Sequence, residues 1–363
     1  MTAPIQGNQL EATPYDSDND SAFFSSADDG LSLSTSLKSS ILDYRMENGR
    51  TYHRYKDGQY AYPNDELEKD RLDLQHHIYK LMLDGRLYLS PVDKNLQNAL
   101  DIGTGTGIWA IEFAEDHPSA VVVGTDLSPI QPTFVPPNLS FLIDDASEPW
   151  VFKQKFDFIH TRQLHCVVEE KRLMQQALDN LIPGGWFEMQ ELALPYGNDD
   201  NTNDPNSPAS QWCQYMLEAS RLIGKPLDNP PNYAKWMTET GFVNVQSVLY
   251  KWPTNPWPKG KNEKVLGLWN MVNTLDGLDG FTMAMFTRIL KWKPEEVTAL
   301  LAGVRADTKN HAIHNYCPVY VPLCSLLLLQ QSSYKTKTLT LLATSHMGKS
   351  RNKPNNAMLL VKY

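Results

Sequence analysis

From Asn98 onward, short apolar runs alternate with stretches of helical periodicity. A short apolar run bounded by polar residues, Gly or Pro predicts a buried strand, whereas apolar residues that recur every three or four positions predict a helix. Strands are predicted at Asn98–Ile102, Val121–Thr125, Leu139–Ile143, Phe156–His160, Gly185–Gln190, Val243–Tyr250 and Tyr316–Val321. Because strands and helices alternate, we expect an α/β fold with a doubly wound, mainly parallel, seven-stranded Rossmann-like sheet.

The helices that would cover this sheet follow from the same periodicity. They are expected at Asp65–Leu89, Gly107–His117, Glu169–Leu181 and Gln211–Ile223, with further helices over roughly 262–306. Pro63 and Asn64 supply a break and a cap signal just before the first of them. Since this helix precedes the first strand, residues 41–97 are expected to form an N-terminal helical cap on a domain of residues 98–321.

The two ends of the chain differ in composition from this domain. Residues 1–40 are rich in Ser, Asp, Asn and Thr, with six acidic residues and a single base, Lys38. They lack the apolar area needed to fold, so we expect an acidic, disordered tail. Residues 322–363 hold six basic residues and no acidic one, and we treat them as an atypical C-terminal tail.

Composition also restricts the function. With 33 basic and 42 acidic residues, the net charge of −9 argues against direct nucleic-acid binding through a phosphate-neutralising surface. The four cysteines are scattered, without the close pairs of a zinc site or a redox dithiol, so no metal site is predicted. The start of the chain lacks a secretory pattern, and the longest apolar stretch, Val319–Leu329, is too short to cross a bilayer. We expect a cytoplasmic or nuclear protein that is neither secreted nor membrane-bound.

A glycine-rich turn, Asp-Ile-Gly-Thr-Gly-Thr-Gly at residues 101–107, closes the first predicted strand and opens a helix. Glycines let the backbone turn sharply and approach a ligand without a Cβ, beside helix N-terminal amides. The nicotinamide fingerprint is G-x-G-x-x-G, whereas here the third glycine comes one position early. Asp101 would repel a diphosphate but attract a cationic sulfonium and amino group. The turn therefore predicts S-adenosylmethionine rather than NAD as the ligand, held by Asp101, Gly103, Thr104, Gly105 and Gly107.

Carboxylates follow the next two strands. Asp126 ends the second strand, where it would accept hydrogen bonds from ribose hydroxyls, and Asp145 follows the third, where it would accept the adenine amino group. Their neighbours Leu127 and Ala146 are included in the predicted site. Alone, Asp126 would more simply be a helix cap, so the prediction depends on the joint placement of these residues behind the glycine turn.

Two long segments, residues 101–109 and 124–132, resemble the LaeA-like methyltransferases of filamentous fungi. Shorter resembling segments lie at 47–53, 64–66, 70–77, 135–138, 160–162 and 183–186, so the resemblance spans about 41–321. It implies a class I methyltransferase fold with S-adenosylmethionine bound by the glycine turn, Asp126 and the Asp145 region. It also implies that the Tyr52 segment forms a lid over the cofactor. The sequence departs from the family after Val321.

The resemblance leaves two roles open. Family members either methylate a small-molecule intermediate in secondary metabolism, which is the interpretation we favour, or act as nuclear regulators of such gene clusters together with velvet-type partner proteins. Transfer to a hydroxyl would benefit from a base, for which His165 and Glu191 are candidates. Their simpler interpretations are a packed histidine and a hydrogen-bond partner for Arg162. A helix at 281–286 is expected over the mouth of the site, with Met283 and Phe286 setting acceptor specificity.

Overall fold

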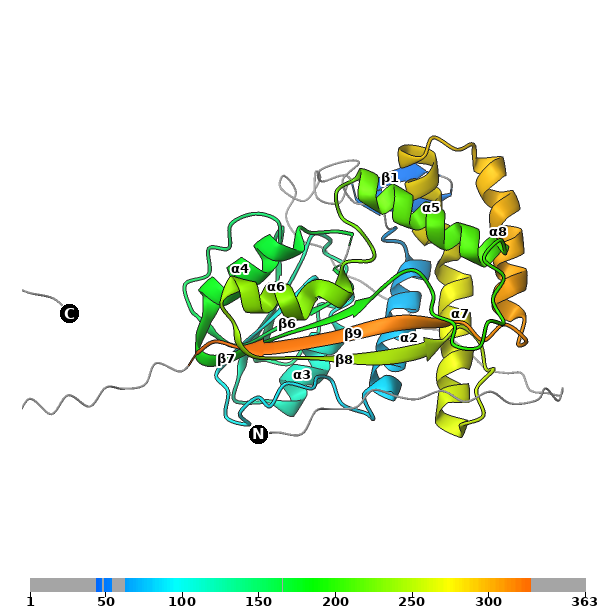
Figure 1. Cartoon of the computed structure of the whole chain (residues 1–363). Coiled ribbons are helices and arrows are strands. Elements are labelled where there is room, and N and C mark those ends of the chain that lie inside the picture. Colours follow the sequence, from blue (N-terminus) through cyan, green and yellow to red (C-terminus); the bar gives the residue numbers. More distant parts are fainter. Residues whose placement is uncertain (1–43, 48, 54–62, 165, 328–363) are drawn as a thin grey trace, which may run out of the picture. The chain divides into compact units, whose positions relative to one another are not determined.

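The computed structural model describes residues 44–47, 49–53, 63–164 and 166–327 (Figure 1). Its centre is a seven-stranded sheet with the strand order β5-β4-β3-β6-β7-β9-β8. The strands are β3 (Asn98–Ile102), β4 (Val121–Asp126), β5 (Leu139–Ile143), β6 (Phe156–Arg162), β7 (Leu181–Leu192), β8 (Val243–Pro253) and β9 (Tyr316–Ser325). All strands from β3 to β7 pair in parallel, while β9 is antiparallel to both β7 and β8. The predicted α/β, mainly parallel sheet is confirmed.

The chain reverses its direction of winding between β3 and β6. It first proceeds outward from β3 through β4 to the edge strand β5, and then returns to place β6 on the other side of β3. At such a switch point the loops after the two strands diverge and leave a crevice beyond their carboxyl ends. Asp101 of β3 lies directly beside His160 of β6 in the register of this pair, so these two residues stand at the crevice.

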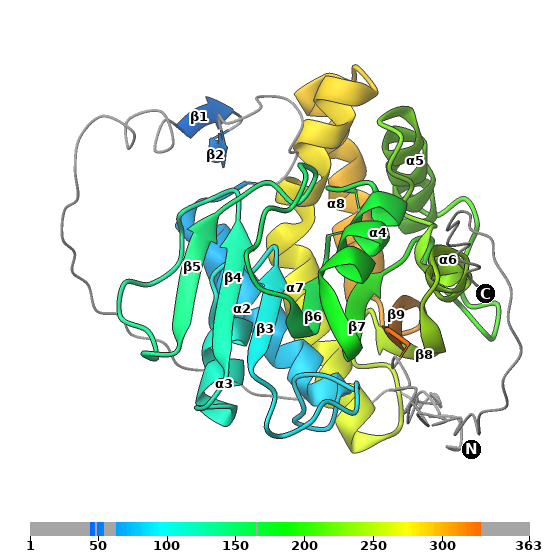
Figure 2. The same ribbon diagram turned by 90° about the vertical axis from the view of Figure 1, so that its left-hand side faces the viewer.

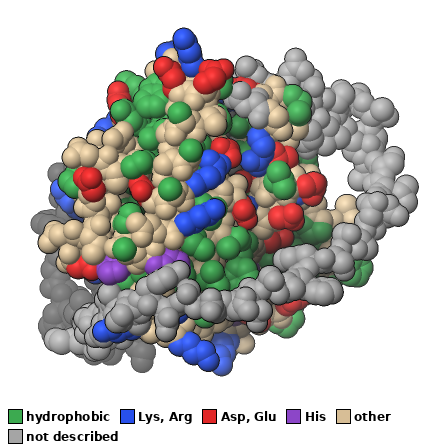
Figure 3. Space-filling view, turned by 90° about the vertical axis from the view of Figure 1, so that its right-hand side faces the viewer, with side chains coloured by type: hydrophobic (Ala, Val, Ile, Leu, Met, Phe, Trp, Pro, Cys, Tyr) green, Lys and Arg blue, Asp and Glu red, His purple; other side chains and the backbone are tan. Residues whose placement is uncertain are grey.

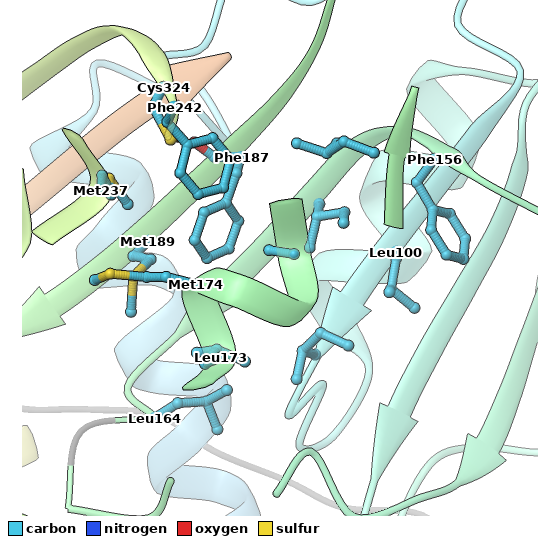
Figure 4. Close-up of a cluster of buried hydrophobic side chains, with 14 of the residues drawn as sticks. Leu100, Phe156, Leu164, Leu173, Met174, Phe187, Met189, Met237, Phe242 and Cys324 are labelled. Carbon is cyan, nitrogen blue, oxygen red and sulfur yellow. The ribbon is translucent and has the colours of Figure 1, made fainter. Parts of the chain in front are cut away.

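Helices cover both faces of the sheet (Figure 2). On one face lie α2 (Glu66–Met82), α3 (Ile108–Asp116) and α7 (Lys261–Ala284), and on the other lie α4 (Glu170–Asn180) and α6 (Tyr233–Thr240). Successive residues of a strand point to opposite faces. Leu100 and Ile102 therefore join the core under α4 and α6, shown in Figure 4, whereas Ala99 packs under α3.

A third group of helices packs together beside the sheet. It consists of α5 (Pro208–Leu222), the π-helical turn η2 (Met285–Ile289) and α8 (Pro294–Lys309), which bury a separate apolar cluster that includes Trp212 and Phe286. Pro294 at the first turn of α8 explains the break after η2, because proline starts a helix readily but does not continue one.

The first helix ends earlier than its apolar pattern predicts. The expected helix Asp65–Leu89 does begin at the Asp65 cap, whose carboxylate accepts the Glu68 N–H at 3.1 Å, but it stops at Met82. Asp84 and Gly85 then take left-handed conformations, with φ of 54° and 81°. Leu87 and Leu89 are buried as a loop, so their apolar character reflects packing and not helical periodicity.

Three further features were not predicted. Residues 41–97 contain a two-stranded hairpin, β1 (Tyr44–Glu47) and β2 (Arg50–His53), besides the helix. Helix α6 and the 3₁₀ turn η1 (Pro230–Asn232) fall in a stretch for which no helix was predicted. Strand β9 continues past Val321 to Ser325, inside the segment assigned to the atypical tail, and Leu323 and Cys324 are fully covered. No helix in the described ranges has the length and apolarity required to span a membrane.

Candidate functional site

Three glycines with positive φ build the turn between β3 and α3. Gly103, Gly105 and Gly107 have φ of 68°, 58° and 83°. A Cβ at Gly103 would stand 2.4 Å from Leu164 Cδ2, and one at Gly107 would stand 2.4 Å from Phe141 Cζ. At Gly105 the nearest heavy atom would be Leu72 Cδ1 at 3.6 Å. The outer glycines are therefore closely packed, whereas a Cβ at Gly105 would make one ordinary van der Waals contact and otherwise face open space.

That open space is a cavity at the carboxyl ends of β3, β4, β5 and β6, which we call the strand-end cavity. Eight of the predicted cofactor-binding residues line it: Asp101, Gly103, Thr104, Gly105, Asp126, Leu127, Asp145 and Ala146. Gly107 does not line it, but forms the N-cap of α3 and lets Phe141 pack beneath the turn. Leu72, Gln75 and His76 of α2 close the opposite side.

Asp101 is held rigidly at the floor of the cavity. Its Oδ2 accepts the Thr104 hydroxyl at 2.6 Å, and its Oδ1 lies 2.8 Å from His160 Nδ1. The His160 ring is fully buried and stacks on Trp109, with ring centroids 3.8 Å apart. The imidazole of His160 thus orients the carboxylate of Asp101, which the sequence predicted as part of the cofactor site.

Asp126 lies where the strand-end cavity meets another cavity, which is described below. Its Oδ2 accepts the Gly105 N–H at 2.9 Å and its Oδ1 the Ser128 N–H at 2.9 Å. Burial raises the pKa of this carboxyl to about 6, although both backbone hydrogen bonds lower it. Asp145 accepts the Ser147 N–H at 2.8 Å, and burial raises the pKa of its neighbour Asp144. Two strand-end carboxylates are therefore available to the hydroxyl and amino groups of a nucleoside.

The second cavity, which we call the cap cavity, lies between α2, α5 and α7. Its apolar wall comprises Leu72, Ile130, Leu192, Leu194, Tyr196, Trp212, Met216, Leu227, Phe281 and Cys317. Polar side chains also line it: Asn64, Glu68, Lys69, Arg71, Gln75, Asp126, Ser128, Gln163, Asn270, Asn273 and Thr274. Arg71 donates to Glu68 at 2.7 Å and to Asn273 at 2.8 Å and lies over the Phe281 ring. Its charge is thus matched within the wall.

The expected specificity helix is only partly correct. Phe281 lines the cap cavity, but neither Met283 nor Phe286 does. Phe286 is fully buried in the apolar cluster of α5, η2 and α8, because α7 passes into the π-helical turn at Met285. Of the other aromatic candidates in the second half of the chain, Trp212 reaches the cavity.

Besides Gly107, two predicted site residues lie away from both cavities. Tyr52 is buried beside Arg288, whose guanidinium lies 4.8 Å from the ring, and it lines neither cavity. Glu191 is fully buried on the α4 face of β7, where it accepts the Leu164 N–H at 2.9 Å. The expected Glu191–Arg162 contact is replaced by one between Arg162 Nε and Gln190 Oε1 at 2.9 Å. These placements argue against a lid role for Tyr52 and a base role for Glu191. His165 lies outside the described residues.

Several residues of the site were missed by sequence reasoning. Leu72, Gln75 and Gln163 line both cavities, and Arg162 and His76 line the strand-end cavity. Gln163 has a φ of 57°, held by hydrogen bonds to Gln190 and Tyr79. The only signal for Arg162 was its place in the family-like His-Thr-Arg segment.

Comparison with known proteins identifies the family. A model described as a methyltransferase domain matches residues 74–247. Probable methyltransferase tdiE of Emericella nidulans is 42% identical over 80% of this chain and 91% of its own length. Methyltransferase pytC of Aspergillus terreus is 41% identical over 77% and 87%, and secondary metabolism regulator laeA of Monascus pilosus is 36% identical over 74% of each chain. This chain belongs to the LaeA-like methyltransferase family.

As a LaeA-like methyltransferase, the protein uses S-adenosylmethionine, and the strand-end cavity suits this cofactor. Gly105 leaves room for close approach of the backbone, and the carboxylates of Asp101, Asp126 and Asp145 all line the cavity, which would suit a cationic ligand with hydroxyl and amino groups. Acidic and basic side chains are interspersed on the face that carries α7 and α8 (Figure 3). That face lacks the single-sign basic surface that phosphate backbones bind.

Proposed function

We propose that this LaeA-like methyltransferase methylates a small molecule of secondary metabolism. The supporting observation is that the strand-end cavity and the cap cavity share one wall, formed by Leu72, Gln75, Gly105, Asp126 and Gln163. A group in the cap cavity therefore lies next to a cofactor in the strand-end cavity. The two methyltransferases compared above, tdiE and pytC, are more similar to this chain than the regulator compared above, whose name places it in secondary metabolism.

We assign separate tasks to the residues that line the two cavities. Bound S-adenosylmethionine supplies a methyl group already activated on a sulfonium, so the protein chiefly needs to place a nucleophile in line and exclude water. The carboxylates of Asp126 and Asp145 would hold the nucleoside, and Asp101, fixed by Thr104 and His160, would hold the ammonium group. Leu72 of α2 supplies an apolar cover at the junction of the cavities.

The shape and polarity of the cap cavity favour an uncharged acceptor with an aromatic or apolar body and a polar edge. The apolar wall with Trp212 and Phe281 faces the body, and the amides of Asn270 and Asn273 face the edge. An anionic acceptor is disfavoured because Arg71 is already paired with Glu68, and Lys69 with Glu66.

We retain His165 as the proposed base for a hydroxyl acceptor. Its neighbours Gln163 and Leu164 line the cavities. Of the carboxylates described in the cap cavity, Glu68 is ion-paired with Arg71, and both oxygens of Asp126 accept backbone N–H groups. Burial raises the pKa of the Cys317 thiol to about 12. His165→Gln should lower kcat and remove the acidic limb of its pH profile, leaving affinity for S-adenosylhomocysteine intact. An unchanged pH profile would contradict this role.

The deciding experiment is transfer of labelled methyl groups from S-adenosylmethionine into an extract of a strain lacking this gene. Label in the low-molecular-weight fraction supports the proposal; label confined to protein supports the regulatory alternative, as does stable co-purification with a velvet-type protein from the nucleus. Phe281→Ala should then raise the KM for the acceptor without changing S-adenosylhomocysteine binding. The matched control is Leu268→Ala on the exposed side of the same helix, which should change neither.

A further inference from the structure

The strand-end cavity holds one guanidinium whose hydrogen bonding is incomplete. Arg162, the last residue of β6, lines this cavity but not the cap cavity. Its Nη2 is buried and has no hydrogen-bond partner in the described part of the chain. A buried guanidinium N–H without an acceptor is costly, so a specific unsatisfied donor calls for an explanation.

The other atoms of this guanidinium are fixed by three contacts. Nε donates to Gln190 Oε1 at 2.9 Å, Nη1 lies 3.0 Å from His76 Nδ1, and the group lies 4.3 Å from the centroid of the Tyr79 ring. The Gln190 amide is oriented by its own donor, which bonds to Leu87 O and Glu188 Oε1. Its oxygen is thereby left to accept from Arg162.

His76 has a protonation state that suits this arrangement. Burial, and next the charge of Arg162, lower the pKa of its imidazole to about 4. The ring is neutral at neutral pH, so its Nδ1 is able to accept from Nη1. With Nε and Nη1 both engaged, Nη2 is the donor left over.

The sheet register places this donor relative to Asp101. Asp101 pairs with His160 across β3 and β6, and Arg162 follows His160 by two positions, so both residues of β6 point to the same face. One face of the crevice therefore presents an anchored carboxylate and, further along the strand, an anchored guanidinium. An amino acid zwitterion carries the complementary pair of charges.

We propose that Arg162 binds the carboxylate of the cofactor's amino acid end, while Asp101 binds its ammonium group. Gln190, His76 and Tyr79 act as positioning residues that aim Nη2. The inference rests on S-adenosylmethionine binding in the strand-end cavity. Because Arg162 lines that cavity alone, the carboxylate it recognises belongs to the cofactor and not to the methyl acceptor.

The test compares three ligands by calorimetry, with no acceptor and no turnover. S-adenosylhomocysteine has the carboxylate, its decarboxylated form lacks only that group, and methylthioadenosine lacks the whole amino acid end. The wild-type protein should bind S-adenosylhomocysteine about 10- to 100-fold more tightly than the decarboxylated form, as expected for charge-assisted hydrogen bonds. Arg162→Met should abolish this preference and leave methylthioadenosine binding within about threefold, within the context-dependent spread of single contacts.

Two further variants keep the test decisive. Arg172→Met removes an arginine from the exposed surface of α4 and should leave all three affinities unchanged. Arg162→Lys keeps the positive charge but lacks the planar guanidinium with its paired N–H donors. It should therefore retain part of the preference for S-adenosylhomocysteine over the decarboxylated form, even if Arg162→Met fails to fold. Equal binding of S-adenosylhomocysteine and its decarboxylated form by the wild-type protein would overturn the inference about Arg162 but not the cofactor site. Failure to bind any of the three would instead contradict the cofactor site itself.

Discussion

Gly105→Ala should separate the stability of the glycine turn from its function. Its φ of 58° costs a residue with a Cβ about 1–2 kcal/mol. No steric cost is added, because the nearest heavy atom would be Leu72 Cδ1 at 3.6 Å. For a domain of this size the melting temperature should fall by roughly 2–4 °C for each kcal/mol. The protein should therefore stay folded at room temperature.

Binding should suffer more than folding in this variant. Gly105 and Leu72 both line the wall shared by the two cavities, so the added methyl group narrows the junction. Overfilling a packed site costs about 1–3 kcal/mol, which corresponds to roughly a 5- to 150-fold loss of affinity. Calorimetric titration with S-adenosylhomocysteine measures this loss, and thermal unfolding followed by circular dichroism measures the stability.

Gly107→Ala is the matched control. Its φ of 83° carries the same backbone cost, and its Cβ would also stand 2.4 Å from Phe141 Cζ, yet Gly107 lines neither cavity. We expect a total cost of about 2–5 kcal/mol in the free energy of unfolding, with near-normal affinity in the folded fraction. The reasoning is wrong if Gly105→Ala binds S-adenosylhomocysteine as tightly as the wild type, or if Gly107→Ala is the more stable of the two.

Three other substitutions test separate parts of the structure. In Asp126→Asn, S-adenosylhomocysteine should bind more weakly than in the wild type. Wild-type affinity should decline as pH falls through about 6, because burial raises the pKa of Asp126 to about 6 and only the ionised form is purely an acceptor. The variant should not show this decline. The folded state binds the proton of the Asp126 carboxyl more tightly than the unfolded chain does, so the contribution of Asp126 to the free energy of unfolding should decrease as pH rises from about 4 to 6. Calorimetric titrations and thermal unfolding across this pH range measure the pH dependence of affinity and of stability. Glu188→Gln should lower the free energy of unfolding by about 3 kcal/mol in urea denaturation, since its buried carboxylate accepts the N–H groups of Leu89 and Ser90 and the Ser90 hydroxyl; the exposed Glu115→Gln should change it by less than about 0.5 kcal/mol. Tyr52→Phe removes a buried hydroxyl that has no hydrogen-bond partner among the described residues, so the free energy of unfolding should change by less than about 1 kcal/mol. S-adenosylhomocysteine affinity should be unaffected, whereas a weaker affinity would restore the lid role.

The carboxylates that line the strand-end cavity were predictable because each depends on its own strand. Asp101, Asp126 and Asp145 follow successive parallel strands, and the carboxyl ends of such strands meet at one edge of the sheet. Their approach to one another thus follows from the fold class, without knowledge of side-chain contacts. The glycine turn is equally local, since it connects one strand to the next helix.

Other residues of the site depend on register and on alternation. Arg162 reaches the cavity because it lies on the same face as His160 and opposite Gln190 in β7, which no single-strand pattern reveals. Glu191 was misassigned for the same reason. It follows Gln190 by one position and so points to the opposite face, toward α4. The hairpin that contains Tyr52 was missed because its two strands are only four residues each and hold few apolar side chains.

The family match covers the strand-end cavity almost completely but the cap cavity only in part. The methyltransferase-domain model matches residues 74–247, and within that range lies every residue of the strand-end cavity except Leu72. The cap cavity instead takes Glu68 and Arg71 from before this range and Asn273 and Phe281 from after it. Similarity over the matched range therefore bears on how the methyl donor is held. We expect the choice of methyl acceptor to depend in part on the first half of α2 and on α7, which lie outside the matched range, so relatives that share the donor site are free to differ in their acceptors.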